Sequence, residues 1–328
     1  MKRVTIYDVA KEAKVSLATV SRVVNGSDVV KQATREKVEA AINKLGYKPN
    51  AIAQGLALQK TTTIGMIITD ASVFNTGQII NGVLDAAKIK NYNIIMHALS
   101  PGITDINEII ETIIKSRVDG VIIYNEDIDL TDFEEISKYN IPIVFIGSKL
   151  QCKNVGSVHV DLEKVCSEAV EMFFEKGYKN IAVLQERHNK NINDEMLSGV
   201  NAAYKNHGLK FDGYIEIPSN VKTSYDCMKE YFKSNRPEVV IVHRDSQAIA
   251  TVNAAKENNL KVPDDIQVLC LLDTKYNLMI RPQISSYALP SYDLGSIAMA
   301  SIEKMLNENE EGKSYELSYF YIPRKSTK

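Results

Sequence analysis

Five residues in the N-terminal segment VSLATVSRVVNG carry side chains that could contact DNA. Arg22 has a planar guanidinium that can donate two parallel hydrogen bonds to O6 and N7 of guanine. Leu17 and Ala18 offer only apolar surface, which suits the methyl group of thymine. Thr19 and Ser21 carry hydroxyls that suit phosphate or sugar contacts, and such contacts set the register of a protein on a duplex. The alternative for Arg22 is a solvated arginine on the surface.

The elements that would position these side chains are three short helices within residues 1–47. Thr5, with Asp8 three residues later, resembles a capping box that opens the first helix. Ser16 starts the second helix after a tight turn, and a third helix is predicted over about residues 34–45. Two short helices joined in this way form a helix-turn-helix, whose second helix enters the major groove. The residues predicted to form its core are Val9, Val20, Val23 and Leu45.

The charge of the chain is divided unevenly along its length. Residues 1–60 contain 11 Lys and Arg against 5 Asp and Glu, whereas the remaining residues contain 28 against 36. A basic head on an acidic body is expected where only the head meets a polyanion, although chance clustering would give the same counts. The charge distribution therefore favours double-stranded DNA as the partner of the head.

From Thr63 the pattern changes to apolar strands that alternate with amphipathic helices. The predicted strands are IGMII (64–68), NIIMHA (93–98), GVIIY (120–124), PIVFIG (142–147), IAVLQ (181–185), VVIVH (239–243) and IQVLCLL (266–272). Near-continuous apolar strands between helices are typical of parallel sheets covered on both faces. We therefore predict an α helix-turn-helix domain followed by an α/β body of two doubly wound parallel-sheet subdomains, with a ligand-sized crevice between them.

Several classes of protein lack support in the sequence. No apolar run is long enough to span a membrane, and no apolar stretch of the signal-peptide kind follows the N-terminus. The four cysteines are far apart, which disfavours a disulfide or metal framework and favours a reduced cytosolic compartment. Cys270 lies in an apolar run and is predicted to pack in a core. Dinucleotide, P-loop and nucleophile-elbow motifs are absent, so neither an enzyme nor a cofactor is predicted.

Several strings of residues resemble the LacI/GalR family of bacterial repressors, and most closely its catabolite control protein A branch. The strings are VTIYDVA, VSLATVSRVVNG, LGYKPNAIAQGLA, TTTIG, DGVII, KNIAV, VPDDI, MIRPQ and the C-terminal STK. The resemblance covers the whole chain. It implies a helix-turn-helix domain over 1–47, a hinge helix or linker over 48–60, and a regulatory and dimerisation body over 61–328.

The resemblance also implies how the body is assembled. Three segments cross between two Rossmann-like subdomains of periplasmic-binding-protein type, so each subdomain is discontinuous in sequence. One covers about 61–161 plus 290–318, and the other covers about 162–289 plus 319–328. The resemblance further implies homodimerisation through the body, and two-fold symmetry then requires a pseudo-palindromic operator.

Contacts with that operator follow from the same resemblance. Leu56 matches a leucine that wedges between base pairs in the minor groove and bends the duplex, in a segment that folds in the family when the dimer meets its operator. Gln54 stands where many relatives carry Arg or Lys. The implied minor-groove contacts are Ala53, Gln54, Leu56 and Ala57. The implied backbone contacts are Thr5, Tyr7, Ser16, Thr19, Ser21, Asn25, Tyr47 and Asn50. Tyr47 could instead pack in the core, and Leu56 could be a dimer contact only.

Two aspartates are candidate effector-binding residues by resemblance. Sugar-binding members hold their ligand with an Asp after a strand, which Asp245 matches, and with a second Asp whose nearest counterpart is Asp273. Their arginine clamp is matched here by Asp194, so the bidentate contact to sugar hydroxyls is missing. The alternative for Asp245 is a cap on the helix that follows.

A protein effector is the other possibility for this branch. Catabolite control protein A takes a serine-phosphorylated phosphocarrier protein as corepressor, and two of its arginines receive the phosphate. The matching positions here are Ala300 and Phe320, whereas Tyr292 is retained. Without the two guanidiniums the charge-assisted pairs to phosphoserine are lost. We therefore hypothesise a specialised relative of the global catabolite regulator.

The predicted function is a sequence-specific, homodimeric transcription repressor of carbohydrate-utilisation genes, with polysaccharide or starch degradation as one option. A cytoplasmic, nucleoid-associated protein is expected, with a small-molecule or protein effector and no membrane partner. The alternatives are a global carbon catabolite regulator with a phosphocarrier-protein corepressor, and a solute-binding module. Activation at some promoters is compatible with the same residues.

Overall fold

The computed structural model describes residues 4–48, 61–68, 74–98, 106–124, 138, 141–150, 152–187, 190–218 and 220–328. Two units are distinguished by their internal contacts. The first unit extends to Thr63 and includes Arg117–Asp119, in which the Asp119 carboxylate accepts hydrogen bonds from the backbone and hydroxyl of Thr61 at 2.9 and 3.0 Å. The second unit contains the rest of the body.

The head of the first unit consists of α1 (Ile6–Ala13), α2 (Leu17–Val24) and α3 (Gln32–Leu45). Local hydrogen bonds fix where these helices begin and end. The Asp8 carboxylate accepts from the backbone N–H of Thr5 at 2.8 Å, and Gly46 closes α3 in the left-handed conformation that glycine tolerates. The predicted core is confirmed, since Val9, Val20 and Val23 are buried together and Leu45 packs against them. The third helix begins two residues earlier than predicted.

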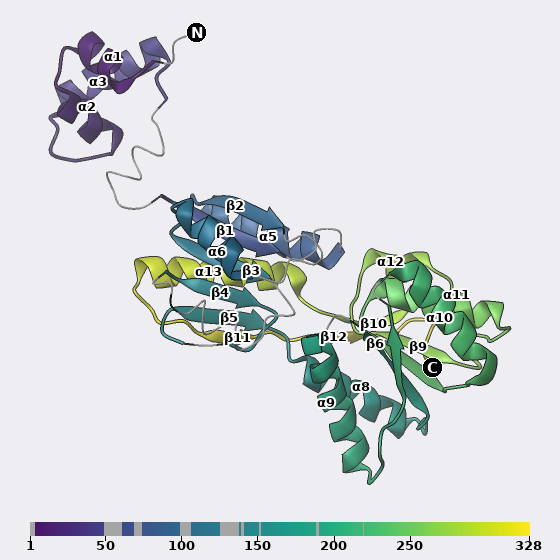
Figure 1. The fold of residues 1–328 in the computed structure, drawn as a ribbon. Helices are drawn as coiled ribbons and strands as arrows, with labels where there is room; N and C mark the ends of the chain where they lie inside the picture. Colours follow the sequence, from purple (N-terminus) through teal and green to yellow (C-terminus); the bar gives the residue numbers. More distant parts are fainter. Residues whose placement is uncertain are drawn as a thin grey trace. The chain divides into compact units, whose positions relative to one another are not determined.

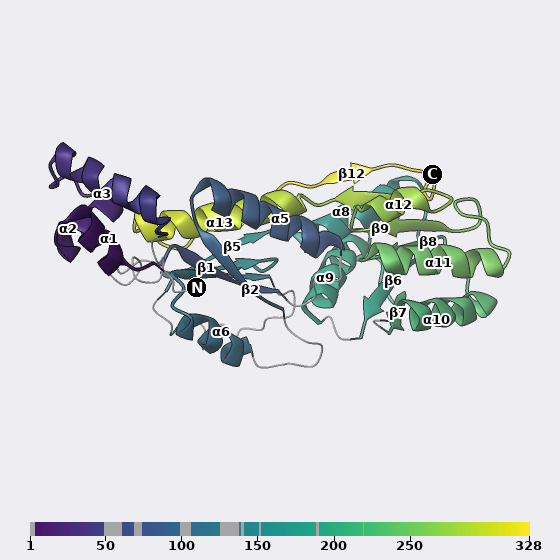
Figure 2. The same cartoon turned by 90° about the horizontal axis from the view of Figure 1, so that it is seen from above.

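The first sheet of the body has the strand order β11-β5-β4-β3-β1-β2, and its strand pairs are parallel wherever their register is defined. Its strands are β1 (Thr63–Ile68), β2 (Asn93–Ala98), β3 (Gly120–Tyr124), β4 (Ile143–Ile146), β5 (Val155–His159) and β11 (Ser314–Glu316). Its helices are α5 (Phe74–Ile89), α6 (Ile106–Lys115) and α13 (Ser291–Asn307). Figures 1 and 2 show α5 and α13 on one face and α6 on the other, and apolar side chains of α5 and α13 form a core with the strands.

The second sheet has the strand order β12-β10-β9-β8-β6-β7, in which only β12 pairs antiparallel among the described strands. Its strands are β6 (Ile181–Glu186), β7 (Tyr214–Ile217), β8 (Val239–Val242), β9 (Gln267–Cys270), β10 (Ser285–Ala288) and β12 (Phe320–Ile322). Its helices are α8 (Leu162–Glu175), α9 (Lys190–Asn206), α10 (Val221–Ser234), α11 (Asp245–Glu257) and α12 (Lys275–Met279). Separate cores cover its two faces, and Cys270 lies in one of them as predicted.

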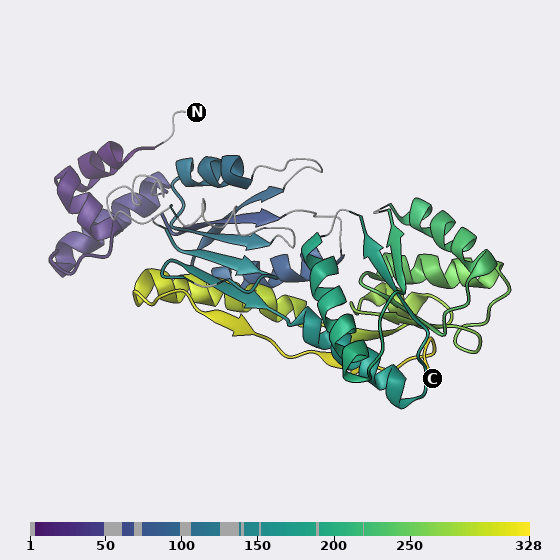
Figure 3. The same cartoon turned by 60° about the horizontal axis from the view of Figure 1, so that its bottom comes forward.

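The chain passes between the two sheets three times. It leaves the first sheet after β5, returns after β10, and leaves again after β11, so the C-terminal segment in yellow in Figure 3 contributes a strand to each sheet. The predicted fold class, a helix-turn-helix domain plus two parallel-sheet subdomains, is confirmed. The strands that the sequence did not predict are β5, β7, β10, β11 and β12. Within the described residues, no helix is long and apolar enough to cross a membrane.

Candidate nucleic-acid interface

The predicted base-reading residues share the outer face of α2. Val20 and Val23 are buried against the rest of the head, and this burial turns Leu17, Ala18 and Arg22 toward solvent. Within the part of the head that is described, Arg22 has no carboxylate partner. Its guanidinium is therefore available for an external acceptor, as a contact to guanine requires.

Hydrogen bonds between residues three or four apart hold the hydroxyls of this helix in place. Ser16 caps α2 by accepting from the backbone N–H of Thr19 at 3.1 Å, and the two hydroxyls are 2.8 Å apart. The Asn25 amide donates to the Ser21 hydroxyl at 3.4 Å. These polar groups lie at both ends of α2, where they could bracket the base-reading face with backbone contacts.

The other predicted backbone contacts differ in exposure. Tyr7 is 68% exposed on α1, while the Thr5 hydroxyl donates to Asp8 at 2.7 Å beside it. Tyr47 packs partly against the head core, so the packing role and a backbone contact are both open to it. The remaining predicted contacts fall outside the described residues, namely Asn50, Ala53, Gln54, Leu56 and Ala57.

The two candidate effector aspartates lie at the carboxyl edge of the second sheet, where open α/β sheets bind ligands. Asp245 begins α11 and accepts from the Thr274 hydroxyl at 2.6 Å and from the backbone N–H of Ser246 at 2.6 Å. Asp273 lies beyond β9 and pairs with the Arg324 guanidinium at 2.6 Å. Both carboxylates therefore already have partners within the chain.

Three further charged residues at this edge were missed by the sequence reasoning. Arg324 comes from the C-terminal segment. It is far from Asp273 along the sequence, so no sequence pattern indicated that the two residues would meet. Glu186 ends β6 and Arg244 follows β8, with 3.6 Å between the Arg244 Nε and a Glu186 carboxylate oxygen. The position of these two residues directly after parallel strands was the signal that could have found them.

The two positions that match the phosphate-binding arginines carry no charge. Phe320 is 69% exposed at the start of β12, and Ala300 is partly exposed on α13. Tyr292, in the first turn of α13, donates its hydroxyl to Asp85 at 3.0 Å. Among the described residues, no cluster of three or more His, Cys, Asp or Glu has the geometry of a metal site.

A helix-turn-helix head followed by two parallel sheets connected by three crossings defines a class of DNA-binding transcription regulators. Two family models match the chain: "Bacterial regulatory proteins, lacI family" over residues 5–50, and "Periplasmic binding protein-like domain" over residues 170–327. The chain belongs to the lacI family of bacterial regulatory proteins. It is therefore a DNA-binding transcription regulator and not an enzyme.

Relatives and solved structures agree with this assignment. The catabolite control protein A of Staphylococcus epidermidis is 35% identical over 94% of both chains, and that of Priestia megaterium is 34% identical over 99% of both. The crystal structure of the lac repressor dimer bound to operator and an anti-inducer superposes with a TM-score of 0.88 at 25% identity, covering 99% of both chains.

Proposed function

We propose that this regulator represses transcription by binding a pseudo-palindromic operator as a homodimer. The observation that carries the proposal is the exposed face of α2, on which Leu17, Ala18 and Arg22 project away from the buried valines. A recognition helix with its leading residues exposed suits insertion into a major groove. Each protomer would then read one half-site.

The proposed contacts divide into three groups. Base edges in the major groove are read by Leu17, Ala18 and Arg22. The DNA backbone is held by Thr5, Tyr7, Ser16, Thr19, Ser21, Asn25, Tyr47 and Asn50. The minor groove at the centre of the operator is entered by Ala53, Gln54, Leu56 and Ala57, in a linker over 48–60 that joins the head to the body. This division separates residues that specify sequence from residues that set register.

Two exposed apolar patches support dimerisation through the body. The α5–β2 patch, on the first sheet, comprises Leu84 and Ile89 of α5 and Met96 of β2, which lies on the same side of its strand as Ile94, a residue packed against the core beneath α5. The α12 patch, on the second sheet, comprises Tyr276, Leu278 and Met279. Exposed apolar patches of this kind mark interaction sites, and a second copy of the chain is the occupant that a two-fold operator requires. The lac repressor, of similar fold, is described as a dimer on its operator.

The proposed effector site is built on the two aspartates that the sequence indicated. A small molecule would bind at the carboxyl edge of the second sheet near Asp245 and Asp273, where it would have to displace their present partners. Since Ala300 and Phe320 replace the arginines of catabolite control protein A, we propose a specialised regulator of carbohydrate-utilisation genes. The alternative is a global carbon catabolite regulator with a phosphocarrier-protein corepressor, and the relatives' name, catabolite control protein A, favours the catabolite-control part of it.

Titration separates these two alternatives. Serine-phosphorylated phosphocarrier protein is added to the regulator, with the unphosphorylated form as control, and binding is followed by calorimetry. A specialised regulator shows no phosphate-dependent binding. Tight binding that requires the phosphate would instead support the global catabolite regulator.

Selection of bound duplexes from a random pool tests the proposed DNA binding. Two related half-sites with approximate two-fold symmetry are expected, and their affinity should exceed that of random duplex at both low and moderate salt. If the selection enriches no symmetric sequence, even with cell metabolites present, the repressor model is refuted. If a symmetric site is selected, the genes beside its genomic copies identify the regulated pathway.

A further inference from the structure

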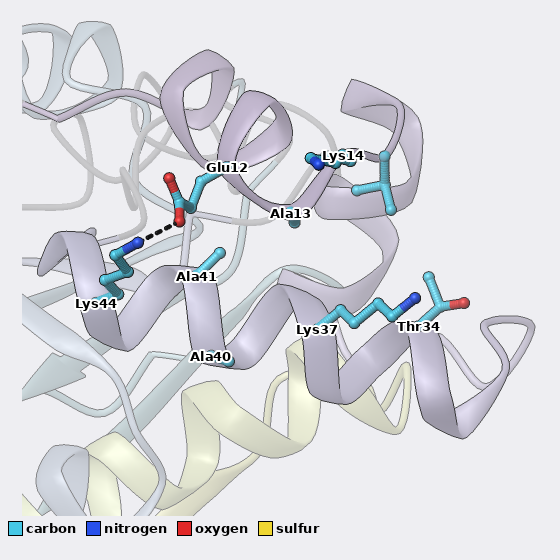
Figure 4. Close-up of a pocket in the computed structure, with 9 residues that line it drawn as sticks. Glu12, Ala13, Lys14, Thr34, Lys37, Ala40, Ala41 and Lys44 are labelled. Carbon is cyan, nitrogen blue, oxygen red and sulfur yellow. Dashed lines mark hydrogen bonds and ion pairs between the residues drawn. The ribbon is translucent and has the colours of Figure 1, made fainter.

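A shallow groove of about 420 Å³ runs across the head between α1 and α3. Figure 4 shows its walls, with Glu12 on the α1 side and Lys37 and Lys44 on the α3 side. The residues that line it come from the end of α1, the turn after α1, and α3. None of them belongs to α2 or to the proposed DNA contacts, so the groove has no role in the function proposed above.

The rim of the groove is basic. Lys14 follows α1 in a left-handed conformation, with φ at 56°, and its backbone N–H donates to the Ala10 carbonyl, which fixes where the side chain leaves the backbone. Lys37 and Lys44 are seven residues apart on α3, or about 10 Å along the helix axis. Within the described part of the chain, Lys14 and Lys37 form no ion pair with a carboxylate.

One carboxylate lies among these lysines. The Glu12 carboxylate is 2.7 Å from the Lys44 ammonium, and this hydrogen bond, together with the positive charges of Lys44 and Lys14, lowers the pKa of Glu12. Glu12 is therefore ionised at neutral pH. It would repel any anionic group brought close to Lys44, phosphate and carboxylate alike, whereas Lys14 and Lys37 still leave the rim with a net positive charge.

The floor of the groove is apolar. Ala13 and Val15 come from the end of α1 and the turn after it, and Ala40 and Ala41 come from α3. A DNA backbone offers only phosphate and sugar to such a floor. A protein segment can place an apolar side chain on it and carboxylates on the rim at the same time.

We propose that this groove docks an acidic segment of a partner protein, with the carboxylates of that segment on Lys14 and Lys37 and an apolar side chain on the alanine-rich floor. Complementary charge selects the partner and the small floor residues allow close approach. Because the groove and the recognition face share no residue, the same head can hold DNA and the partner together.

The test uses the full-length protein and a fluorescein-labelled peptide that repeats Glu-Glu-Leu, with the corresponding Gln-Gln-Leu peptide as control. Fluorescence anisotropy at low salt should show binding of the glutamate peptide alone. Lys14→Glu and Lys37→Glu should each weaken it by about fivefold, because each replaces an attraction with a repulsion. Lys37→Arg should bind as the wild type does, and Lys11→Glu, an equal charge change outside the groove, should alter binding by less than about twofold.

Two measurements on the same variants decide between protein and DNA as the occupant. Saturating random-sequence duplex should leave the peptide bound, and Lys37→Glu should keep the DNA affinity and salt dependence of the wild type. Displacement of the peptide by DNA, or a salt dependence of DNA binding that falls by about one charge in Lys37→Glu, would make the groove a phosphate contact and overturn the proposal. Equal peptide binding by wild type and both glutamate variants would overturn it as well.

Discussion

Arg22 combines three properties that a base-reading side chain needs. It lies on the face of α2 opposite to the buried Val20 and Val23, and its planar guanidinium matches the two acceptors of guanine. Ser16 fixes the start of the helix through its cap, so the direction in which the arginine leaves α2 is set by the fold of the head. Lysine at this position would keep the charge and lose the two-pronged geometry.

Replacement of Arg22 by alanine should therefore change specificity more than overall affinity. We expect Arg22→Ala to cost about 1–3 kcal/mol on the selected operator and to abolish discrimination at one base pair per half-site. Arg22→Lys should retain affinity for random duplex while losing the same discrimination. Binding to a series of operators with single base-pair substitutions measures both quantities, and a loss of equal size on every operator would mean that Arg22 contacts phosphate.

The ion pair between Asp273 and Arg324 fastens the C-terminal segment to the second sheet. The Arg324 side chain is only 9% exposed and also donates to the Ser286 hydroxyl at 2.6 Å. Asp273→Ala would leave this nearly buried guanidinium without its counter-charge, so we expect a loss of about 2–3 kcal/mol in the free energy of unfolding. Asp264→Ala is the matched control, since Asp264 is 68% exposed and 3.5 Å from Lys328. Urea unfolding of both variants should show a loss only for Asp273→Ala.

We expect His159 to make the stability of the body depend on pH. It is 5% exposed at the end of β5, and burial together with the positive charge of Lys149 lowers its pKa, although Glu316 and Asp161 oppose the shift. The unfolded chain therefore takes up a proton more readily than the folded chain does. Stability should be complete above the unfolded value near 6.5 and should fall as the pH drops below it.

His159→Gln removes this titration and keeps a polar side chain. The free energy of unfolding of the wild type should fall between about pH 7.5 and pH 5.5, and the variant should lose less over the same interval. Urea unfolding at the two pH values provides the comparison. Equal losses in both proteins would exclude His159 as the source of the pH dependence.

At the scale of elements, α5 and α13 approach each other through paired glycines. A Cβ on Gly82 would lie 2.0 Å from the Tyr292 carbonyl oxygen, and a Cβ on Gly295 would lie 2.0 Å from the Ile79 carbonyl oxygen. Both contacts are with backbone, which cannot move aside as a flexible side chain can. The spacing of the two helices over the first sheet therefore depends on glycine at both positions.

Gly295→Ala should push the helices apart and cost about 1–3 kcal/mol in the free energy of unfolding. Gly77→Ala is a control in α5 itself, because a Cβ at Gly77 would meet no atom within 4 Å. That substitution should leave stability unchanged or raise it by up to about 1 kcal/mol, since alanine favours a helix over glycine. Thermal unfolding distinguishes the two, and similar melting temperatures for both variants would contradict the packing argument.

The elements that the sequence predicted are those whose causes are local. The caps at Ser16 and Gly46 depend on hydrogen bonds to residues within one turn, and the apolar strands are long enough to recognise by composition. The short strands β11 and β12 contain polar or exposed residues, and they are strands because distant residues pair with them, as Ser314 does with Ser157. Sequence patterns carry no record of such pairing.

The candidate site was predictable to the same extent. The outer face of α2 follows from helical periodicity, because the buried valines define the exposed positions. The partners of Asp273 could not be predicted from any such periodicity, because Arg324 reaches Asp273 only after the third crossing of the chain between the sheets. The Asp273 carboxylate, which the sequence indicated as a possible effector contact, is thus paired with an arginine of the same chain.

At the scale of the whole molecule, the proposed function requires that two heads reach one operator together. The α5–β2 patch and the α12 patch lie on different sheets of the body, so a two-fold contact that uses both would join each subdomain to its counterpart. An isologous interface places every substitution in it twice. Exposed residues of the patches are therefore sensitive positions for assembly and insensitive positions for the fold of a single chain.

Met279→Asp is the substitution that separates these roles. Met279 is 68% exposed, so an aspartate should leave the folded chain intact, yet two carboxylates buried in the dimer contact should dissociate it. Operator affinity should then fall by about tenfold or more, because each head would bind its half-site without the help of the other. Sedimentation velocity gives the assembly state, and gel shift gives the affinity. Leu209→Asp, an apolar residue 39% exposed outside both patches, should remain dimeric and bind normally. A Met279→Asp protein that stayed dimeric, together with an equally dimeric Met96→Asp protein, would show that neither patch holds the two copies together.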